Sequence, residues 1–122
     1  MGKDRSRAGG GAELLPGTLE LLVLKALSLG KEHGYGIVRR IQRTSDGALL
    51  VEEGSLYPAL HRMERKGWIA SQWGSSAAGR RAKFYALSRD GRSQLAARAR
   101  AWERDAAAVE RVLAARPGEA GA

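Results

Sequence analysis

The 122-residue chain contains no cysteine, which excludes disulfide bonds, thiolate metal sites and cysteine nucleophiles. It has two histidines, His33 and His61, so a site built from several histidines is not expected. The longest nearly apolar run, from Leu19 to Leu29, is interrupted by polar residues and is shorter than the about 20 residues that cross a bilayer. The first eleven residues lack the apolar core of a signal peptide. These absences favour a protein of the cytoplasm.

Positive charge is what the chain has in excess. It contains 21 Lys and Arg against 13 Asp and Glu, a net charge of +8, in a length that suits one compact domain. Such a protein usually meets a polyanion, either nucleic acid or an anionic membrane, although a merely soluble basic surface is the alternative. Residues 33–92 hold 11 of the basic and 5 of the acidic residues, a net +6, and no acidic residue occurs from Trp68 to Ser88.

Hydrophobic periodicity predicts three helices followed by a hairpin. The helices are expected at residues 14–29 with Thr18 as N-cap, at residues 33–44, and from Ser55 to Gly67. Residues 49–51 could form a short extended piece. Residues 68–73 and 80–87 alternate as two strands, with residues 74–79 as the tip of the hairpin. The inward stripe of the third helix is expected to be Leu56, Ala59, Leu60 and Met63.

A long helix is expected from the N-cap Ser88 to about Ala115. Its apolar residues are spaced four and three apart, the 3.5-residue repeat of helix-on-helix packing. At about 40 Å this helix is longer than a three-helix core could cover, and the first helix is apolar nearly all round. We therefore expect a second copy of the chain to cover both helices, through Leu21, Leu24, Leu95, Ala99, Trp102, Ala106, Val109 and Leu113.

Three helices followed by a basic hairpin is the order of the winged helix-turn-helix fold. The expected fold class is mainly α with a small β-hairpin wing. A helix fits the major groove of DNA, about 12 Å wide, and the hairpin lays cations along the phosphates or in the minor groove. The expected organisation is a flexible arm at residues 1–13, a DNA-binding domain at 14–88, a dimerisation helix at 89–115 and a disordered tail at 116–122.

The candidate DNA contacts are the outward residues of the second helix, the third helix and the wing. Ser55 could bond a phosphate or cap its helix, or do both. Tyr57 and His61 could contact DNA or lie in solvent, and the basic residues could bind phosphate or form a solvated face. The full set is Tyr35, Arg39, Ser55, Tyr57, Pro58, His61, Arg62, Arg65, Arg80, Arg81 and Lys83. Trp68 and Trp73 are expected to be core or hairpin residues.

No residue pattern indicates an enzyme, a metal site or a cofactor. His61 lacks both a nucleophile and an orienting carboxylate in the sequence, so a catalytic role is not expected.

Four stretches resemble the PadR family of transcriptional regulators: LLPGTLELLVLKAL, HGYGIVRRI, VEEGSLYPALHRMERKGWI and RRAKFYALSRDGR. The resemblance covers about Leu14 to Leu113, and the third stretch is its most specific part. It implies a homodimeric winged-helix repressor of the short branch, in which one long C-terminal helix dimerises. In some relatives, aromatic residues of this helix line a pocket for flat hydrophobic compounds. Trp102 is therefore a candidate ligand-binding residue, with a packed dimer-core tryptophan as the alternative.

The resulting hypothesis is a repressor that binds a palindromic operator with two wing-helix units, spaced by the dimer. A small hydrophobic or aromatic effector that re-angles the long helices would release the DNA. Two alternatives stay open. One is a constitutive regulator without an effector, and the other is an adaptor that uses the winged helix to bind proteins.

Overall fold

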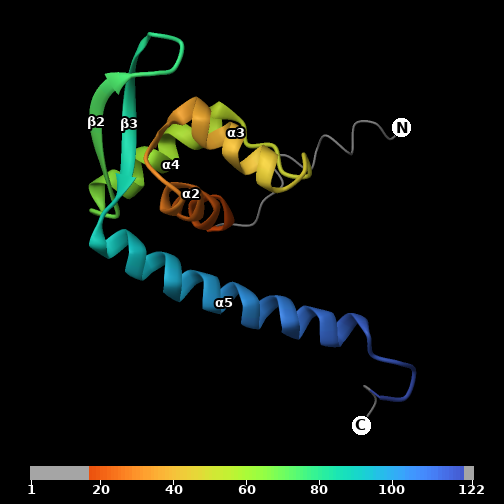
Figure 1. The fold of residues 1–122 in the computed structure, drawn as a ribbon. Helices are drawn as coiled ribbons and strands as arrows, with labels where there is room; N and C mark the ends of the chain where they lie inside the picture. Colours follow the sequence, from red (N-terminus) through yellow and green to blue (C-terminus); the bar gives the residue numbers. More distant parts are fainter. Residues whose placement is uncertain (1–16, 120–122) are drawn as a thin grey trace.

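The computed structural model describes residues 17–119, so the predicted arm at residues 1–13 and the last residues of the predicted tail lie outside it. The described chain folds into helices and a small antiparallel sheet, and the long last helix leaves the body (Figure 1). This confirms the expected class, mainly α with a β-hairpin wing. The elements are α2 (Thr18–Ser28), β1 (Glu32–His33), α3 (Gly34–Thr44), α4 (Glu53–Arg65), β2 (Ile69–Ser75), β3 (Arg81–Leu87) and α5 (Arg89–Leu113).

The sheet has three strands in the order β1-β3-β2. The expected hairpin forms, with Ile69 opposite Leu87 and Ser75 opposite Arg81. Strand β1 was not expected, because two residues are too few to show an alternating pattern. It pairs with β3 and ties the start of α3 to the base of the wing. The extended piece considered at residues 49–51 is not a strand.

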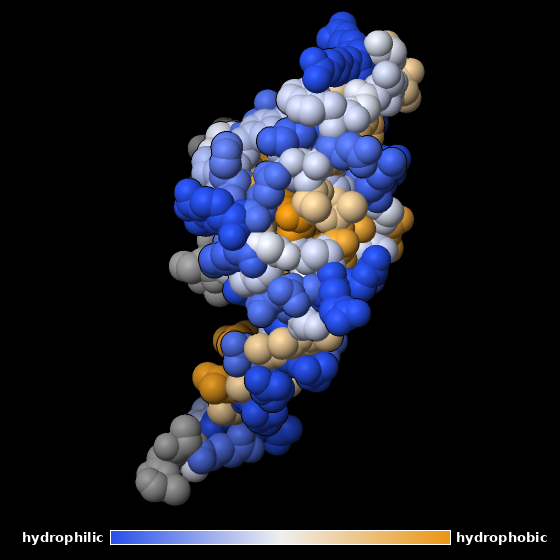
Figure 2. Space-filling view, turned by 90° about the vertical axis from the view of Figure 1, so that its left-hand side faces the viewer, coloured by the Kyte–Doolittle hydropathy of each residue, from blue (hydrophilic) through white to orange (hydrophobic). Residues whose placement is uncertain are grey.

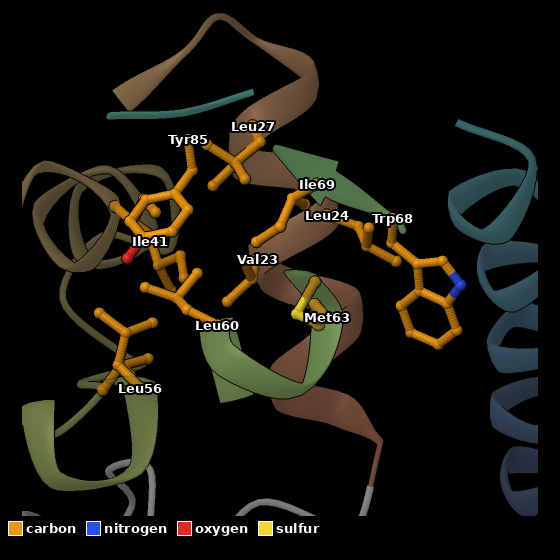
Figure 3. Close-up of a cluster of buried hydrophobic side chains, with 13 residues drawn as sticks. Val23, Leu24, Leu27, Ile41, Leu56, Leu60, Met63, Trp68, Ile69 and Tyr85 are labelled. Carbon is orange, nitrogen blue, oxygen red and sulfur yellow. The ribbon is translucent and has the colours of Figure 1, made fainter. Parts of the chain in front are cut away.

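The core lies between α2, α3, α4 and the base of the sheet, where the side chains converge in Figure 3. The stripe predicted on α4 is confirmed, because Leu56, Ala59, Leu60 and Met63 are all buried. The prediction for Leu24 is wrong. This residue was assigned to a dimer surface, but it is fully buried inside a single chain, because α2 is covered by other elements of its own protomer on several sides.

The starts of two helices differ from expectation. Thr18 is the first residue of α2 and does not cap it; the cap is Gly17, whose φ of 88° lies in the left-handed region that favours glycine. Helix α4 begins two residues before Ser55, so Ser55 lies inside the first turn and is not the N-cap. The cap is Glu52, whose side chain makes no capping hydrogen bond.

Helix α3 is held against α2 by the side chain of one arginine, Arg40. Arg40 donates hydrogen bonds to the backbone carbonyls of Ala26 and Gly30, each at 2.8 Å, and to the carboxylate of Glu32 at 2.9 Å. The Nδ1 atom of His33 accepts a hydrogen bond from the N–H of Gly36 at 3.1 Å and caps the helix. These contacts fix the start of α3 beside the wing.

Helix α5 packs on the body only over its first turns. Ser88 caps it as predicted, its Oγ accepting from the N–H of Gly91 at 3.0 Å. Gly91 lies so close to the carbonyl of Trp68 that a Cβ would collide with it. Leu95 packs against the core, and the guanidinium of Arg98 lies 4.7 Å from the ring of Trp68. Beyond this point the helix projects away from the rest of the protomer (Figure 1).

Candidate nucleic-acid interface

The face of α4 opposite its buried stripe carries the residues that could reach a groove of DNA. Because each residue turns a helix by about 100°, Gly54, Pro58, His61 and Arg65 lie opposite Leu56, Ala59, Leu60 and Met63. All four outward residues are exposed. They offer an imidazole, a guanidinium and, at Pro58 and Gly54, little bulk near the start of the helix. This combination suits close approach to a base edge or a phosphate.

Tyr57 and Arg62 lie on the two flanks of this face. The ring of Tyr57 packs against Gly34 of α3, where a Cβ would collide with it, and 43% of the tyrosine stays exposed. Burial raises the pKa of the Tyr57 hydroxyl, and the carboxylate of Glu53 adds to this effect. The phenol therefore stays protonated at neutral pH and can donate a hydrogen bond.

Arg62 points toward the body of the protein. Its Nε lies 3.5 Å from Oε2 of Glu20, a buried carboxylate at the start of α2. The other oxygen of Glu20 lies 3.5 Å from Nη1 of Arg98 on α5. A buried carboxylate is costly without partners, so this pairing gives Arg62 a role inside the protomer. About half of the Arg62 side chain remains exposed, so a phosphate contact is compatible with the pairing.

The wing places its cations on and beside β3. Arg80 and Arg81 are exposed, whereas Lys83 is half-buried, with its Nζ 3.9 Å from a carboxylate oxygen of Glu64 on α4. The guanidinium of Arg81 lies over the ring of Trp73, 4.5 Å from its centre. Hydrophilic side chains accordingly gather at the top of the molecule in Figure 2, where the tip of the wing lies.

A cleft of about 800 Å³ joins the wing to the starts of α3 and α4. It brings together six of the predicted DNA contacts, and none of the side chains that line it is acidic. Arg39 lies over the ring of Tyr35 at 5.7 Å, at the edge of the cleft formed by α3. An extended polyanion fits such a surface better than a neutral ligand does. The predicted residues in the cleft are Tyr35, Arg39, Tyr57, Arg81 and Lys83, with Arg80 at the tip.

The second half of α5 exposes the residues predicted to dimerise. Trp102 is 51% exposed, Val109 55% and Leu113 80%, and hydrophobic atoms show along the lower part of the molecule in Figure 2. Leu95 and Ala99, earlier in the same repeat, are partly covered by their own protomer. The first residues of the repeat, Leu95 and Ala99, thus pack α5 against the body. The later ones, from Trp102 to Leu113, project beyond the rest of the protomer.

Sequence reasoning missed two residues at this surface. Gly54 lies on the outward face of α4, and no described residue outside its own stretch of helix comes within 4 Å of where its Cβ would be. Trp73 is a hairpin residue, one of the two places expected for it, but its 56% exposure on β2 was not anticipated and it was not assigned to the site. The alternation of β2 and β3 would have placed Trp73 on the same face as the wing cations if the register had been known.

Residues 17–119 have no cluster of His, Asp and Glu side chains that could hold a metal ion. None of the helices in this part of the chain is both long and apolar enough to span a membrane.

Comparison with known proteins gives one consistent result. The family described as Transcriptional regulator PadR-like family matches residues 23–97. The chain is similar to a PadR family transcription regulator from Clostridium difficile, with 28% identity and a TM-score of 0.69 over 80% of this chain and 99% of that one. It is also similar to a PadR-like transcriptional regulator from Bacillus cereus, with 27% identity and a TM-score of 0.70 over 82% and 95% of the two chains.

A third similar structure is a PadR family transcriptional regulator from Eggerthella lenta, with 28% identity and a TM-score of 0.68 over 82% of this chain and 85% of that one. The family match begins within α2 and ends within α5. It therefore includes all of α4 and the wing, and it stops before the exposed second half of α5.

Proposed function

Because the chain belongs to the PadR-like family of transcriptional regulators, we propose that it is a cytoplasmic, homodimeric repressor of a palindromic operator in double-stranded DNA. The observation that carries the proposal is the cleft between the wing, α3 and α4, whose lining contains cations and no carboxylate. In this arrangement α4 enters the major groove with His61 and Arg65 toward the bases. The wing places Arg80 and Arg81 against phosphates or the minor groove.

Dimerisation is proposed through the second half of α5. Trp102, Ala106, Val109 and Leu113 form one apolar stripe that lies beyond the reach of the protomer's own core. A helix of 25 residues is about 37 Å long, so it can hold two DNA-binding units well apart. A two-fold dimer then requires two half-sites about one helical turn apart, and occupation of a promoter by the dimer represses it.

An effector is proposed to bind where the two copies of Trp102 approach each other. The support is its 51% exposure on a stripe that only a second chain would cover. A panel of planar aromatic compounds, titrated while tryptophan fluorescence and DNA affinity are followed, tests this role. The expected result is quenching together with loss of DNA binding. A flat response across the panel contradicts the effector and leaves the constitutive regulator.

The proposal as a whole is tested by DNA titration at several salt concentrations. Residues 17–119 offer no acidic partner within 4 Å of Arg39, Arg65, Arg80 or Arg81, so a dimer presents eight such arginines. If all of them contact phosphates, log K falls against log salt with a slope of about −7. A protein-binding adaptor predicts weak affinity and little dependence on salt, and that result would contradict the proposal.

Two double variants that remove the same charge distinguish a direct contact of the wing with DNA from a general effect of net charge on binding. Changing Arg81 and Lys83 together to Ala should weaken binding to every duplex and make the slope shallower by about 2 for the two copies of Arg81 counted above, and by about 4 if Lys83 also contacts phosphate. The control changes Arg104 and Arg111, which are exposed on the side of α5 opposite the apolar stripe. This control removes the same charge and should leave the slope nearly unchanged. Equal effects of the two pairs would contradict a wing contact.

A further inference from the structure

Trp73 is a large aromatic residue that lies outside the hydrophobic core. It is 56% exposed on β2, whereas Trp68, five residues earlier in the chain, is 9% exposed and belongs to the core cluster. An indole that is more than half exposed contributes less burial to the fold than a core tryptophan such as Trp68 does. The contacts of the Trp73 side chain within the wing are therefore the evidence for its role.

The ring of Trp73 lies beneath the guanidinium of Arg81 on the neighbouring strand. The register places Trp73 opposite Lys83 and Ser75 opposite Arg81, so Trp73 and Arg81 are diagonal neighbours on one face of the hairpin. The guanidinium carbon of Arg81 lies 4.5 Å from the centre of the Trp73 ring, which is the geometry of a cation–π contact. The same face carries Tyr85, which is buried against the helices. The stack therefore lies on the side of the wing that faces the helices.

The two cations of this face have different surroundings. Lys83 lies near the carboxylate of Glu64 at 3.9 Å and over the ring of Tyr85 at 5.9 Å. Arg81 has no carboxylate partner within residues 17–119, and Trp73 is its aromatic contact. A guanidinium that lies flat on a ring keeps its N–H groups in its own plane, where they can donate to a phosphate in pairs. A carboxylate partner would use those same donors.

We propose that Trp73 is a positioning residue for DNA binding: its indole holds the Arg81 guanidinium flat and directs the N–H edge of Arg81 toward a backbone phosphate. The proposal rests on the DNA-binding function proposed above. Trp73 acts through Arg81, so its effect on affinity should disappear when Arg81 cannot stack or donate in this way. This requirement distinguishes it from a tryptophan that touches DNA itself and from one that only stabilises the hairpin.

The experiment is a double-mutant cycle on the full chain, with affinity measured on a labelled random-sequence duplex of about three helical turns. Trp73→Leu should weaken binding by about threefold per wing, or about tenfold for the dimer, from the strength of an exposed cation–π contact. In the background of Arg81→Gln, Trp73→Leu should have no further effect. With Arg65→Gln on α4 as the control partner, the two effects should instead multiply.

Three results would overturn the proposal. The first is that Trp73→Leu weakens binding equally with and without Arg81. The second is that Trp73→Phe, which keeps a ring, binds as weakly as Trp73→Leu. The third is that wild-type protein shows no salt-dependent binding to the duplex, which removes the proposed function together with this inference. If the leucine variant has a lower melting temperature, the double-mutant cycle is repeated with Trp73→Phe in its place. We then expect a smaller coupling energy between Trp73 and Arg81. Strictly additive effects of the two substitutions would contradict the proposal.

Discussion

Gly54 offers a way to separate folding from DNA binding in one substitution. It is the second residue of α4, it is exposed opposite the buried stripe, and, apart from its chain neighbours and the backbone of its own helix, no described atom lies within 4 Å of the position its Cβ would take. Nothing within the described protomer therefore requires glycine at this position. If a DNA backbone approaches the first turn of α4, the missing side chain gives it room.

The change Gly54→Ala should stabilise the protein. Alanine in a helix is favoured over glycine by about 0.5–1 kcal/mol, because it loses less backbone entropy on folding. The lower end of this range applies to a residue in the first turn, so we expect a gain of about 0.5 kcal/mol in unfolding free energy. This corresponds to a rise of about 2–4 °C in melting temperature for a domain of this size.

The same change should weaken DNA binding. A methyl group placed in a close-packed contact forces its neighbours apart and costs about 1–3 kcal/mol, so affinity should fall at least about fivefold. Thermal denaturation and duplex titration at one fixed salt concentration measure the two effects on the same preparation. The expected result is a variant that is more stable and binds less well.

Ser93→Ala is the matched control for this experiment. Ser93 is exposed early in α5, and alanine there also raises helix propensity, but it adds no atom to α4. The control should be stabilised and should bind DNA as the wild type does. If Gly54→Ala binds with unchanged affinity, the first turn of α4 does not lie against the DNA, and the proposed orientation of this helix is wrong.

Three further predictions concern the dimer and the core. Trp102→Glu should convert the dimer to a monomer in sedimentation experiments, and a stable dimer would refute the proposed apolar seam. Glu20→Gln should lower the unfolding free energy in urea by about 1–2 kcal/mol, less than the about 3–5 of a fully buried pair, because its two arginine partners are 49% and 32% exposed. Burial raises the pKa values of Tyr57 and Tyr85, with smaller contributions from nearby carboxylates. The folded chain then holds protons that the unfolded chain releases, so stability should be complete below about pH 10 and fall as the pH rises further. Melting curves across that range should show a shallower fall for Tyr85→Phe, and an unchanged fall would contradict this origin.

The core-facing residues and helix caps were predictable where they depend on the pattern within one segment. The stripe on α4 and the capping of α5 by Ser88 follow from spacing and side-chain chemistry within one segment, and both are present. Strand β1 was missed because it exists only through its pairing with β3. Leu24 was misplaced because an apolar residue on an all-apolar helix gives no sign of which neighbour covers it.

The candidate site was predictable in composition but not in its pairings. The charge pattern pointed to the second helix, the third helix and the hairpin, and the cleft brings six of their predicted residues together. The links of Arg62 to Glu20 and of Arg81 to Trp73 join separate elements, so no local pattern encodes them. Arg62 is thereby paired with a carboxylate inside the protomer. Arg81 instead contacts an aromatic ring, and its N–H groups have no carboxylate partner within the described residues.

The joint between α5 and the body bears on how an effector would act in the proposed dimer. One carboxylate, that of Glu20, contacts Arg62 on α4 and Arg98 on α5, and Arg98 also lies over Trp68 at the base of the wing. Gly91 lies against the backbone of Trp68, which leaves little room for α5 to bend there. A change in the angle of α5 should therefore carry α4 and the wing along as one body.

Release by an effector would then alter the spacing of two intact DNA-binding units, leaving each unit's shape unchanged. Affinity for a palindromic operator should fall when the effector binds, because its two half-sites no longer match the dimer. Affinity for a random duplex, which needs no fixed spacing, should change little, and so should its salt slope. Equal loss of both affinities would show that the effector acts inside each protomer, and the joint at Glu20 would then be flexible.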